Sequence, residues 1–222
     1  MAFHFERPRG FQFTPGQCVD LTLENPPETD AQGSARTFSI ASPPFEDELL
    51  FITRMRNTAF KRVLGTMPLG TEVALTGPVG SFTLHRYSAK PGIFLAGGIG
   101  ITPFLSILRQ VAHDKAPYFL SLFYSNRRPE DACYLDVLGE LSRLHPGCRS
   151  IPTMTDMAKS HQAWTGETGR ITRALMLKYV PGLRGHVFYI AGPPGMVSAM
   201  RTMLKKWRVL EDDIRSEEFG GY

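Results

Sequence analysis

The chain has 222 residues, of which 42% are apolar and 21% are charged, and its formal net charge at pH 7 is +4. These proportions are those of an ordinary globular protein, so they exclude a fibrous protein and a disordered one. The excess of 25 Lys and Arg over 21 Asp and Glu is scattered along the chain and far smaller than in nucleic-acid-binding domains. We therefore expect no nucleic-acid partner, whereas the mild positive charge suits acidic protein partners.

Cysteine usage and hydropathy narrow the class of protein further. Cys18, Cys133 and Cys148 are too few and too widely spaced for a zinc site or a four-thiolate iron–sulfur cluster. An odd number of cysteines without a C-x-x-C pair fits a reducing compartment. The most apolar stretch, residues 91–108, is interrupted by glycines and Pro103, which favours a strand–turn–helix over a membrane span. We predict a cytoplasmic protein with no metal site and no membrane-spanning segment.

Short strand patterns separated by Pro and Gly turns occupy the first part of the chain. The β-rich runs are residues 17–23, 37–41, 49–54 and 71–75. A short helix is predicted at residues 58–64, with Asn57 or Thr58 as its N-cap. Several short strands at this spacing are typical of a small antiparallel β-barrel, which we assign to residues 1–87.

From residue 88 the pattern changes to alternating strands and helices. Apolar runs of strand length cover residues 93–96, 118–124, 149–153 and 186–191. Helix patterns cover residues 103–112, 129–144, 171–179 and 194–209. This alternation predicts an α/β domain at residues 88–222, with a doubly wound, mostly parallel sheet and helices on both faces.

Two glycine turns lie between a predicted strand and a predicted helix. Residues 97–103, with the sequence GGIGITP, let the backbone approach a phosphate, and the helix N-terminus offers free N–H groups. The spacing is not G-x-G-x-x-G, so the usual dinucleotide fingerprint is absent. Residues 191–196, with the sequence AGPPGM, form the second turn. Either turn on its own is as typical of a structural turn as of a ligand site.

Three further motifs lie outside these turns. Residues 36–39, RTFS, combine a guanidinium for a phosphate, an aromatic face for stacking and a hydroxyl for a ring nitrogen. On a strand, Arg36 and Phe38 would face one side and Thr37 and Ser39 the other. Residues 77–82, GPVGSF, read as a turn that closes the first domain, and the chain ends in EEFGGY.

Together and in this order, the motifs resemble those of the ferredoxin–NADP⁺ reductase superfamily. The family patterns are R-x-[YF]-S, G-P-x-G, G-G-[IV]-G-[IL]-T-P, a G-P-P-x-M-like turn and a C-terminal E-x-[FY], and their counterparts here span residues 36–219. The resemblance implies a flavin-binding barrel followed by an NAD(P)-binding domain. It further implies a stand-alone reductase without an iron–sulfur domain.

The resemblance also implies roles for individual residues. The flavin-binding residues would be Arg36, Thr37, Phe38, Ser39, Ile52, Thr53, Arg54, Thr58, Ala59 and Phe60. Within this set Arg36 would bind the flavin phosphate, Phe38 would pack on the isoalloxazine and Ser39 would lie near flavin N5. The residues implied for the nicotinamide nucleotide are Gly97, Gly98, Gly100, Thr102, Gly192 and Pro193. The catalytic set would be Ser39, Glu217 for proton delivery, and Phe219 as a shield over the flavin ring.

Three departures from the family pattern have consequences. Ala191 stands where many members have Cys, so we expect slower or retuned hydride transfer rather than none. Residues after Phe219 offer Tyr222 as an alternative stacking ring. The strand that usually begins the barrel is not recognisable before Phe3. We expect an open barrel edge, a homo-associating copy that covers it, or a natural start further upstream.

The sequence thus predicts an NAD(P)H-dependent flavoprotein reductase. It would pass a hydride to FAD, with FMN favoured less, and then electrons to an acidic ferredoxin, a flavodoxin, a ferric chelate or a partner subunit. Arg127 and Arg128 follow the strand at 118–124, and the absence of acidic residues at 125–128 favours NADPH over NADH. The alternative is a non-catalytic flavin- or nucleotide-binding regulatory module.

Overall fold

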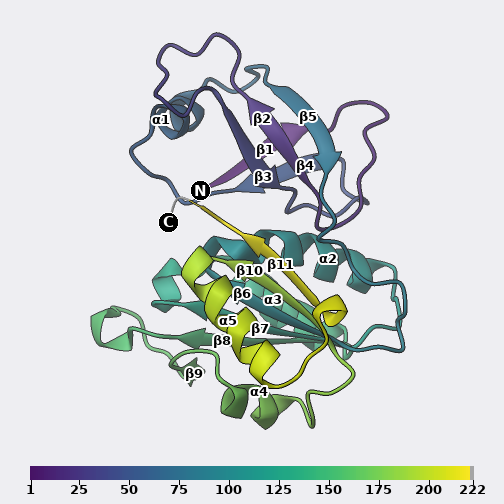
Figure 1. Cartoon of the computed structure of the whole chain (residues 1–222). Helices are drawn as coiled ribbons and strands as arrows, with labels where there is room; N and C mark the ends of the chain where they lie inside the picture. Colours follow the sequence, from purple (N-terminus) through teal and green to yellow (C-terminus); the bar gives the residue numbers. More distant parts are fainter. Residues whose placement is uncertain (221–222) are drawn as a thin grey trace.

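The computed structural model describes residues 1–220, which form an antiparallel domain stacked on an α/β domain (Figure 1). In the antiparallel domain, β1 (Ala2–Glu6) pairs with β4 (Glu48–Ile52), and β2 (Cys18–Thr22) lies between β3 (Ala35–Ser39) and β5 (Ala74–Val79). Among the described residues these strands form two separate sheets, so the predicted barrel is open. The helix α1 (Ala59–Thr66) begins at the predicted N-cap Thr58, whose side chain accepts a hydrogen bond from the Lys61 N–H.

The GPVGSF motif at residues 77–82 was predicted as a turn, and this prediction is wrong for residues 77–79. Gly77, Pro78 and Val79 lie on β5, opposite β2. A bulge in the pairing between Cys18 and Asp20 lets the strand accommodate a proline, which cannot donate to the ladder. Glycine is favoured at position 77 because φ is 135°, and a Cβ there would make a tight contact of 3.2 Å with the Cys18 carbonyl oxygen.

The α/β domain is built on a six-stranded parallel sheet in the order β11-β10-β6-β7-β8-β9. The strands are β6 (Gly92–Gly97), β7 (Leu120–Asn126), β8 (Cys148–Met154), β9 (Glu167–Thr168), β10 (Val187–Gly192) and β11 (Ile214–Glu218). The helices α2 (Thr102–His113) and α3 (Leu135–Leu144) pack on one face, and α4 (Arg173–Tyr179) and α5 (Pro194–Lys206) on the other. The short helices η1 (Gly98–Ile101), η2 (Pro129–Asp131), η3 (Met157–Lys159) and η4 (Glu211–Asp213) lie in the connections. The fold class predicted from the sequence is confirmed. No helix among residues 1–220 has both the length and the apolar character to cross a bilayer.

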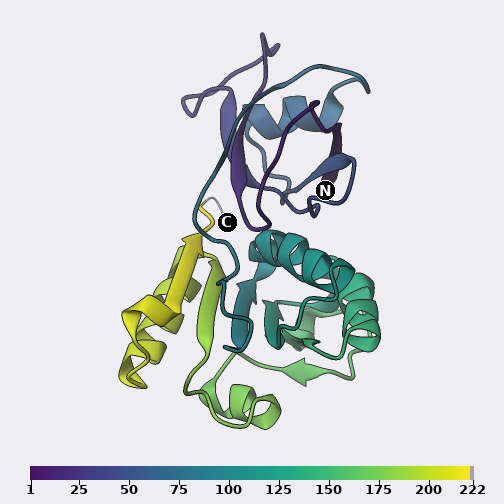
Figure 2. The same cartoon turned by 90° about the vertical axis from the view of Figure 1, so that its right-hand side faces the viewer.

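Helix α2 joins the two domains, because it lies directly beneath the antiparallel sheets (Figure 2). One continuous apolar cluster contains Phe104 and Ile107 of α2 together with Ile52 and Phe82 of the antiparallel part. The Ser106 hydroxyl, also on α2, donates to the Ser42 carbonyl at 2.7 Å. The domains therefore share a packed interface, and residues on its rim are held in a defined relation.

The connection between β5 and β6 is anchored by a buried histidine. His85 is 6% exposed, and its Nε2–H donates to the Lys90 carbonyl at 2.6 Å. The Tyr189 hydroxyl lies 2.8 Å from Nδ1 and accepts from the His85 backbone N–H at 2.8 Å. Because Nε2 must carry the proton, Nδ1 accepts the Tyr189 proton and the ring is neutral. Burial lowers the pKa of His85, the hydrogen bond to the Lys90 carbonyl and the Asp213 carboxylate oppose this, and the cations Arg215 and Lys90 lower the pKa further.

Acidification is therefore expected to destabilise the protein through His85. The folded pKa lies below the unfolded value, so the unfolded state binds more protons, and stability falls as the pH drops from about 6.5 through the folded pKa. Denaturant unfolding at pH 7.5 and pH 5.5 measures the effect. His85→Gln should be less stable at pH 7.5 but should lose less stability on acidification. An equal pH dependence in both proteins would contradict the prediction.

Candidate functional site

A cleft of about 130 Å³ lies between the two domains. Its lining comes from β3, the end of β4, α1, η1, α2 and the chain after β11. The lining residues are Arg36, Thr37, Phe38, Ser39, Ile52, Thr53, Arg54, Lys61, Ile99, Thr102, Phe219 and Gly220. Nine of these twelve are residues predicted as part of the site. The fold thus brings the RTFS motif, the first glycine turn and the C-terminal aromatic to one interdomain cleft.

Ser39 presents a buried hydroxyl to this cleft. The residue is 4% exposed, and within residues 1–220 its Oγ has no hydrogen-bond partner. A buried hydroxyl without a partner loses the free energy of a hydrogen bond, so such groups in native proteins call for a ligand or water. Ser39 Oγ therefore fits the polar edge of a bound ring.

Arg36 and the start of α1 come together as predicted for an anion site. The guanidinium lies over the Phe60 ring, with Cζ 5.0 Å from the centroid. Three carbonyls, those of Gln32, Gly33 and Ala35, hold Nη1 at 2.6–3.0 Å.

A carboxylate lies between this guanidinium and the helix. Asp30 Oδ2 accepts from the Ala59 N–H at 2.9 Å, and Asp30 Oδ1 lies 3.5 Å from Arg36 Nη2. Hydrogen bonds from backbone N–H groups lower the pKa of Asp30. The chain thus places one of its own anions beside the two groups that would bind a phosphate, a feature that the sequence analysis missed.

Phe38 lines the cleft, but little of its side chain is exposed there. It is 8% exposed and packs between Phe51 and Phe60, with ring centroids 5.9 and 6.0 Å away. The strand alternation was predicted correctly in that Arg36 and Phe38 both contact Phe60. That shared side faces the barrel core, and an aromatic ring gains most by being buried there.

Glu217 is a half-buried acid on β11. Its Oε2 has no partner within the described residues, and burial raises the pKa of the carboxyl from 4.5 to about 7. In the sheet Glu217 is the register partner of Ala191, the position that departs from the family cysteine. Burial and then the Glu217 carboxylate raise the pKa of the Cys18 thiol, and Cys18 is the register partner of Ser39. Glu217 does not line the interdomain cleft; it lines a neighbouring cleft together with Phe82 and Arg215.

The two glycine turns meet at the carboxyl ends of β6 and β10. A Cβ on Gly100 would lie 2.2 Å from the Ala191 carbonyl oxygen, so only glycine permits this contact. The Phe219 N–H donates to the Gly192 carbonyl at 2.9 Å, which ties the C-terminal segment to the second turn. Ligands of doubly wound sheets bind at this end of the strands. Phe219 stands where the turns and the interdomain cleft meet.

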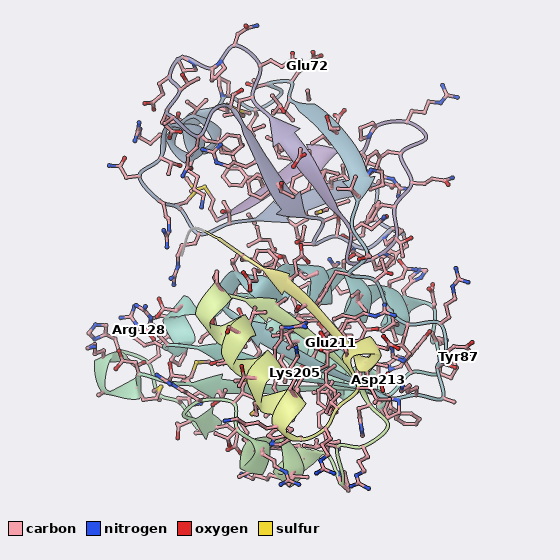
Figure 3. The ribbon with its side chains drawn as sticks, in the orientation of Figure 1. Glu72, Tyr87, Arg128, Lys205, Glu211 and Asp213 are labelled. Atoms are coloured by element: carbon pink, nitrogen blue, oxygen red, sulfur yellow. The ribbon has the colours of Figure 1, made fainter. Side chains whose placement is uncertain are left out.

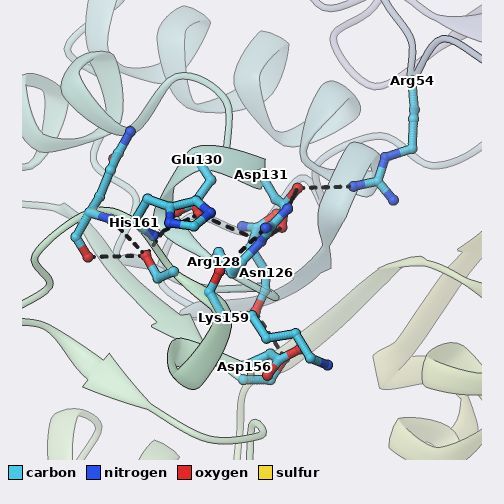
Figure 4. Close-up of polar contacts among 11 residues, drawn as sticks. Arg54, Asn126, Arg128, Glu130, Asp131, Asp156, Lys159 and His161 are labelled. Atoms are coloured by element: carbon cyan, nitrogen blue, oxygen red, sulfur yellow. Dashed lines mark hydrogen bonds and ion pairs between the residues drawn. The ribbon is translucent and has the colours of Figure 1, made fainter.

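Arg128 does not offer the free guanidinium that the sequence analysis expected. Asp131 binds it bidentately at 2.8 and 3.1 Å, and Glu130 lies 3.7 Å away (Figure 4). Asp131 also lies 3.7 Å from Arg54 of the antiparallel domain. The sequence analysis considered residues only as far as 128. The acidic residues Glu130 and Asp131 indicate that the Arg128 guanidinium has a partner within the chain. Arg127 is exposed.

Other candidate residues are less informative. The Thr102 hydroxyl donates to the Ile99 carbonyl at 3.0 Å, and Thr37 Oγ1 donates to Asp20 Oδ1 at 2.5 Å. Tyr222 lies outside the described residues. Lys61 lines the cleft although the sequence analysis did not name it. Its place in the first turn of α1, beside the predicted phosphate-binding residues, was the available signal.

Comparison with known proteins agrees with this geometry. Residues 94–202 match the family model described as the oxidoreductase NAD-binding domain. The chain is 32% identical over 217 residues to the reductase component of propane 2-monooxygenase from Mycolicibacterium smegmatis, with 96% of this chain and 60% of the relative covered. The reductase component of phenol 2-monooxygenase from a Pseudomonas species is 29% identical, at 97% and 60% coverage. The chain thus spans about 60% of the length of these curated relatives.

Solved structures share the fold across almost the whole chain. The cytochrome P450 reductase GcoB of Amycolatopsis superposes with a TM-score of 0.82 at 26% identity, covering 98% of this chain and 64% of that one. Residues 94–202 thus match an oxidoreductase NAD-binding family, and the whole chain has the two-domain fold of the ferredoxin–NADP⁺ reductase superfamily. A ferredoxin–NADP⁺ reductase from Neisseria gonorrhoeae, solved with FAD and NADP, has a TM-score of 0.80 at 23% identity, covering 98% and 91%. The two-domain fold predicted from the sequence is confirmed by these structures.

Proposed function

We propose that the chain is the reductase module of an electron-transfer system, with FAD in the interdomain cleft and NAD(P)H at the two glycine turns. The observation that carries the proposal is the buried, unpartnered Ser39 hydroxyl in a cleft that also contains Arg36 and Phe219. Relatives named as reductase components of monooxygenases support transfer of electrons to a partner protein.

The residues of the cleft fit a flavin, and each performs a separate task. FAD, when bound, supplies hydride acceptance and the release of single electrons. Arg36 and the N-terminus of α1 bind phosphate, since both offer donors toward one point. Ser39 Oγ donates to the ring edge, and the Phe219 ring excludes water from one face. Glu217 Oε2 holds a proton near neutral pH because its pKa is about 7.

We assign flavin binding and NAD(P) binding to separate domains. Residues 1–87 are the proposed flavin-binding unit and residues 88–222 the proposed NAD(P)-binding unit. The boundary falls in the connection between β5, which ends at Val79, and β6, which begins at Gly92. His85 anchors this connection to the sheet, so the two units are held at a fixed spacing.

Reconstitution and anaerobic reduction test the proposed function. The purified protein is dialysed against FAD or FMN, and its visible spectrum is recorded before and after addition of NADH or NADPH. We expect stoichiometric FAD, weaker FMN binding, and bleaching of the flavin band by a nicotinamide nucleotide. Bound flavin that no nicotinamide reduces would identify the non-catalytic module instead. A protein that binds neither flavin contradicts both functions.

We further propose the electron acceptor, the cellular compartment and a site of self-association. An acidic ferredoxin or flavodoxin, a partner subunit or a ferric chelate would receive the electrons in the cytoplasm, and a screen of these acceptors ranks them. β1 pairs with β4 along one edge only in the described sheet. This open edge is a proposed site of homo-association, which light scattering over a range of protein concentrations measures.

Phe219→Ala is expected to open the cleft. The ring lies at the junction of the cleft and the glycine turns, where a nicotinamide must enter to reach the flavin. The variant should keep its fold, shift the visible flavin spectrum and bind nicotinamide nucleotide several-fold more tightly. Stopped-flow reduction and equilibrium titration measure both effects. Tyr222→Ala is the matched aromatic control, and an effect in that variant alone would assign the shielding ring to Tyr222.

Arg127→Glu tests which nicotinamide nucleotide the site reads. Arg127 directly follows β7 and is exposed, whereas the guanidinium of Arg128 is already hydrogen-bonded to Asp131. If Arg127 contacts a 2′-phosphate, the KM for NADPH should rise about tenfold or more, whereas the KM for NADH changes little. Arg143→Glu on the exposed side of α3 is the control for a charge reversal. Equal changes for both nucleotides would exclude a contact to the phosphate.

A further inference from the structure

A second cleft, of about 790 Å³, opens at the amino ends of β10 and β11. It lies between α4, the loop that precedes β10 and the turn that ends α5. We call it the basic cleft and define it by Arg173, Arg184, Lys206, Trp207, Arg208 and Asp213. Figure 3 shows Asp213, together with the neighbouring Lys205 and Glu211, in the part of the α/β domain away from the antiparallel domain.

The charge of the basic cleft is strongly one-sided. Its lining carries four permanent cations and one carboxylate, that of Asp213, which pairs with Lys90. Within residues 1–220 none of the four cations has a carboxylate partner. The adjacent Lys205, by contrast, pairs with Glu211 at 3.2 Å. Since the net charge of the whole chain is only +4, this cleft concentrates uncompensated positive charge.

Two of these cations occupy positions that local physical chemistry disfavours. Arg173 is the first residue of α4, where the positive end of the helix dipole repels a cation. Arg208 follows α5 with φ of 58°, a left-handed conformation that favours glycine at the end of a helix. The negative end of the α5 dipole accounts for Lys206 but for neither Arg173 nor Arg184, which come from other elements. Gathering them here has a local energetic cost, which binding of an anionic partner would offset.

The basic cleft is also partly apolar. Trp207 lies between the cations, with Arg173 Cζ 5.7 Å from its ring centroid. Leu177 and Leu210 line the same cleft and are 41% and 70% exposed. A single phosphate would gain nothing from exposed leucines, and none of these cations is buried enough to form an enclosed phosphate site. A polypeptide that alternates carboxylates with apolar side chains matches both kinds of surface.

We propose that the basic cleft docks an acidic segment of a partner protein. It lies at the amino ends of the parallel strands, whereas the glycine turns and Phe219 lie at the carboxyl ends. β10 has six residues, so about 20 Å of strand separates the two ends. Docking therefore leaves the interdomain cleft open and serves to hold a partner rather than to conduct electrons. The proposal stands whether or not the chain proves to be a reductase.

A synthetic peptide tests the docking. The probe is a fluorescein-labelled dodecamer of Glu-Glu-Leu repeats, and its binding is followed by anisotropy at 50 and 300 mM salt. The variant is Arg184→Glu with Lys206→Glu; the control is Arg143→Glu with Lys159→Glu, which changes the net charge equally on other exposed surfaces. We expect at least tenfold weaker binding in the variant, unchanged binding in the control, and weakening by salt. Equal losses in both pairs would overturn the proposal.

Two further measurements exclude other ligands. In a Trp164→Phe background, the peptide should change the emission of Trp207, and an unchanged emission places the peptide elsewhere. Competition by inorganic pyrophosphate at micromolar concentration would show that the basic cleft binds a small anion and would overturn the proposal. Tighter binding to phosphatidylserine vesicles than to the peptide would overturn it in favour of a membrane surface. NAD(P)H oxidation with ferricyanide should be unchanged in every variant, which separates this test from that of the proposed function.

Discussion

Arg36→Ala is expected to lower the affinity for FAD about 10- to 100-fold, the loss of one or two charge-assisted hydrogen bonds to phosphate. The guanidinium is held over Phe60 by three backbone carbonyls, so it is oriented before any ligand arrives. Equilibrium dialysis and the flavin content of the purified variant measure the change. A variant that keeps full flavin occupancy after dialysis removes Arg36 from the site.

Two companion variants make this result specific. Arg36→Lys keeps the charge but not the planar fork, so its affinity should fall between those of the wild type and Arg36→Ala. Asp30→Asn removes the carboxylate now beside Arg36 while its side-chain oxygen still accepts from the Ala59 N–H. This variant should bind FAD more tightly than the wild type, whereas Arg36→Ala should bind it less tightly. If Asp30→Asn weakens binding as much as Arg36→Ala does, both residues act only by holding the loop.

Glu217→Gln is expected to slow turnover about 100-fold, the usual contribution of a positioned acid. The carboxyl has a pKa of about 7, and its Oε2 has no hydrogen-bond partner in the part of the chain that the structure describes. If its proton is used, the wild-type rate should fall as the pH rises past about 7, and the Gln variant should lack this decline. The pH profile of kcat between pH 5.5 and 9 shows it. Glu218→Gln, one residue along and exposed, is the matched control.

The same substitution has a measurable effect on stability. Burial raises the folded pKa of Glu217 above its unfolded value, so the folded state is favoured at low pH and loses stability as the pH rises through about 7. At pH 8.5, Glu217→Gln should be more stable than the wild type by up to about 3 kcal/mol, since one pKa unit corresponds to 1.36 kcal/mol. At pH 5 the two proteins should unfold at nearly the same denaturant concentration. A destabilised variant at pH 8.5 would show that the carboxylate has a partner.

Elements with strong local patterns were predicted well. The apolar positions Phe104, Ile107, Leu108 and Val111, three and four residues apart, predicted α2, and all four are buried. The helix predicted at 129–144 is instead η2 followed by α3. Tyr134, with φ of 61°, breaks the helical path, and no proline or glycine announces this break.

The strand β11 was missed because its sequence is dominated by charge. No strand was predicted at residues 211–218, yet residues 214–218 pair in parallel with β10. An edge strand needs few apolar residues, since one of its edges and much of its side-chain surface remain in water, and here Ile214 is the buried residue. This strand carries Glu217 into the protein and Phe219 to the cleft, so the missed element positions two predicted site residues.

The sequence by itself determined the two kinds of domain, their order and most residues of the interdomain cleft, because these follow from local periodicity and from motifs in a fixed order. Only the tertiary structure decided what each side chain contacts. Arg128 pairs with Asp131, and most of Phe38 is covered by the core of the antiparallel domain. Within residues 1–220, Ser39 Oγ and Glu217 Oε2 have no hydrogen-bond partner, and the cations of the basic cleft come from three elements. The physical reason is that burial and pairing depend on residues far apart in the chain, which no local pattern records.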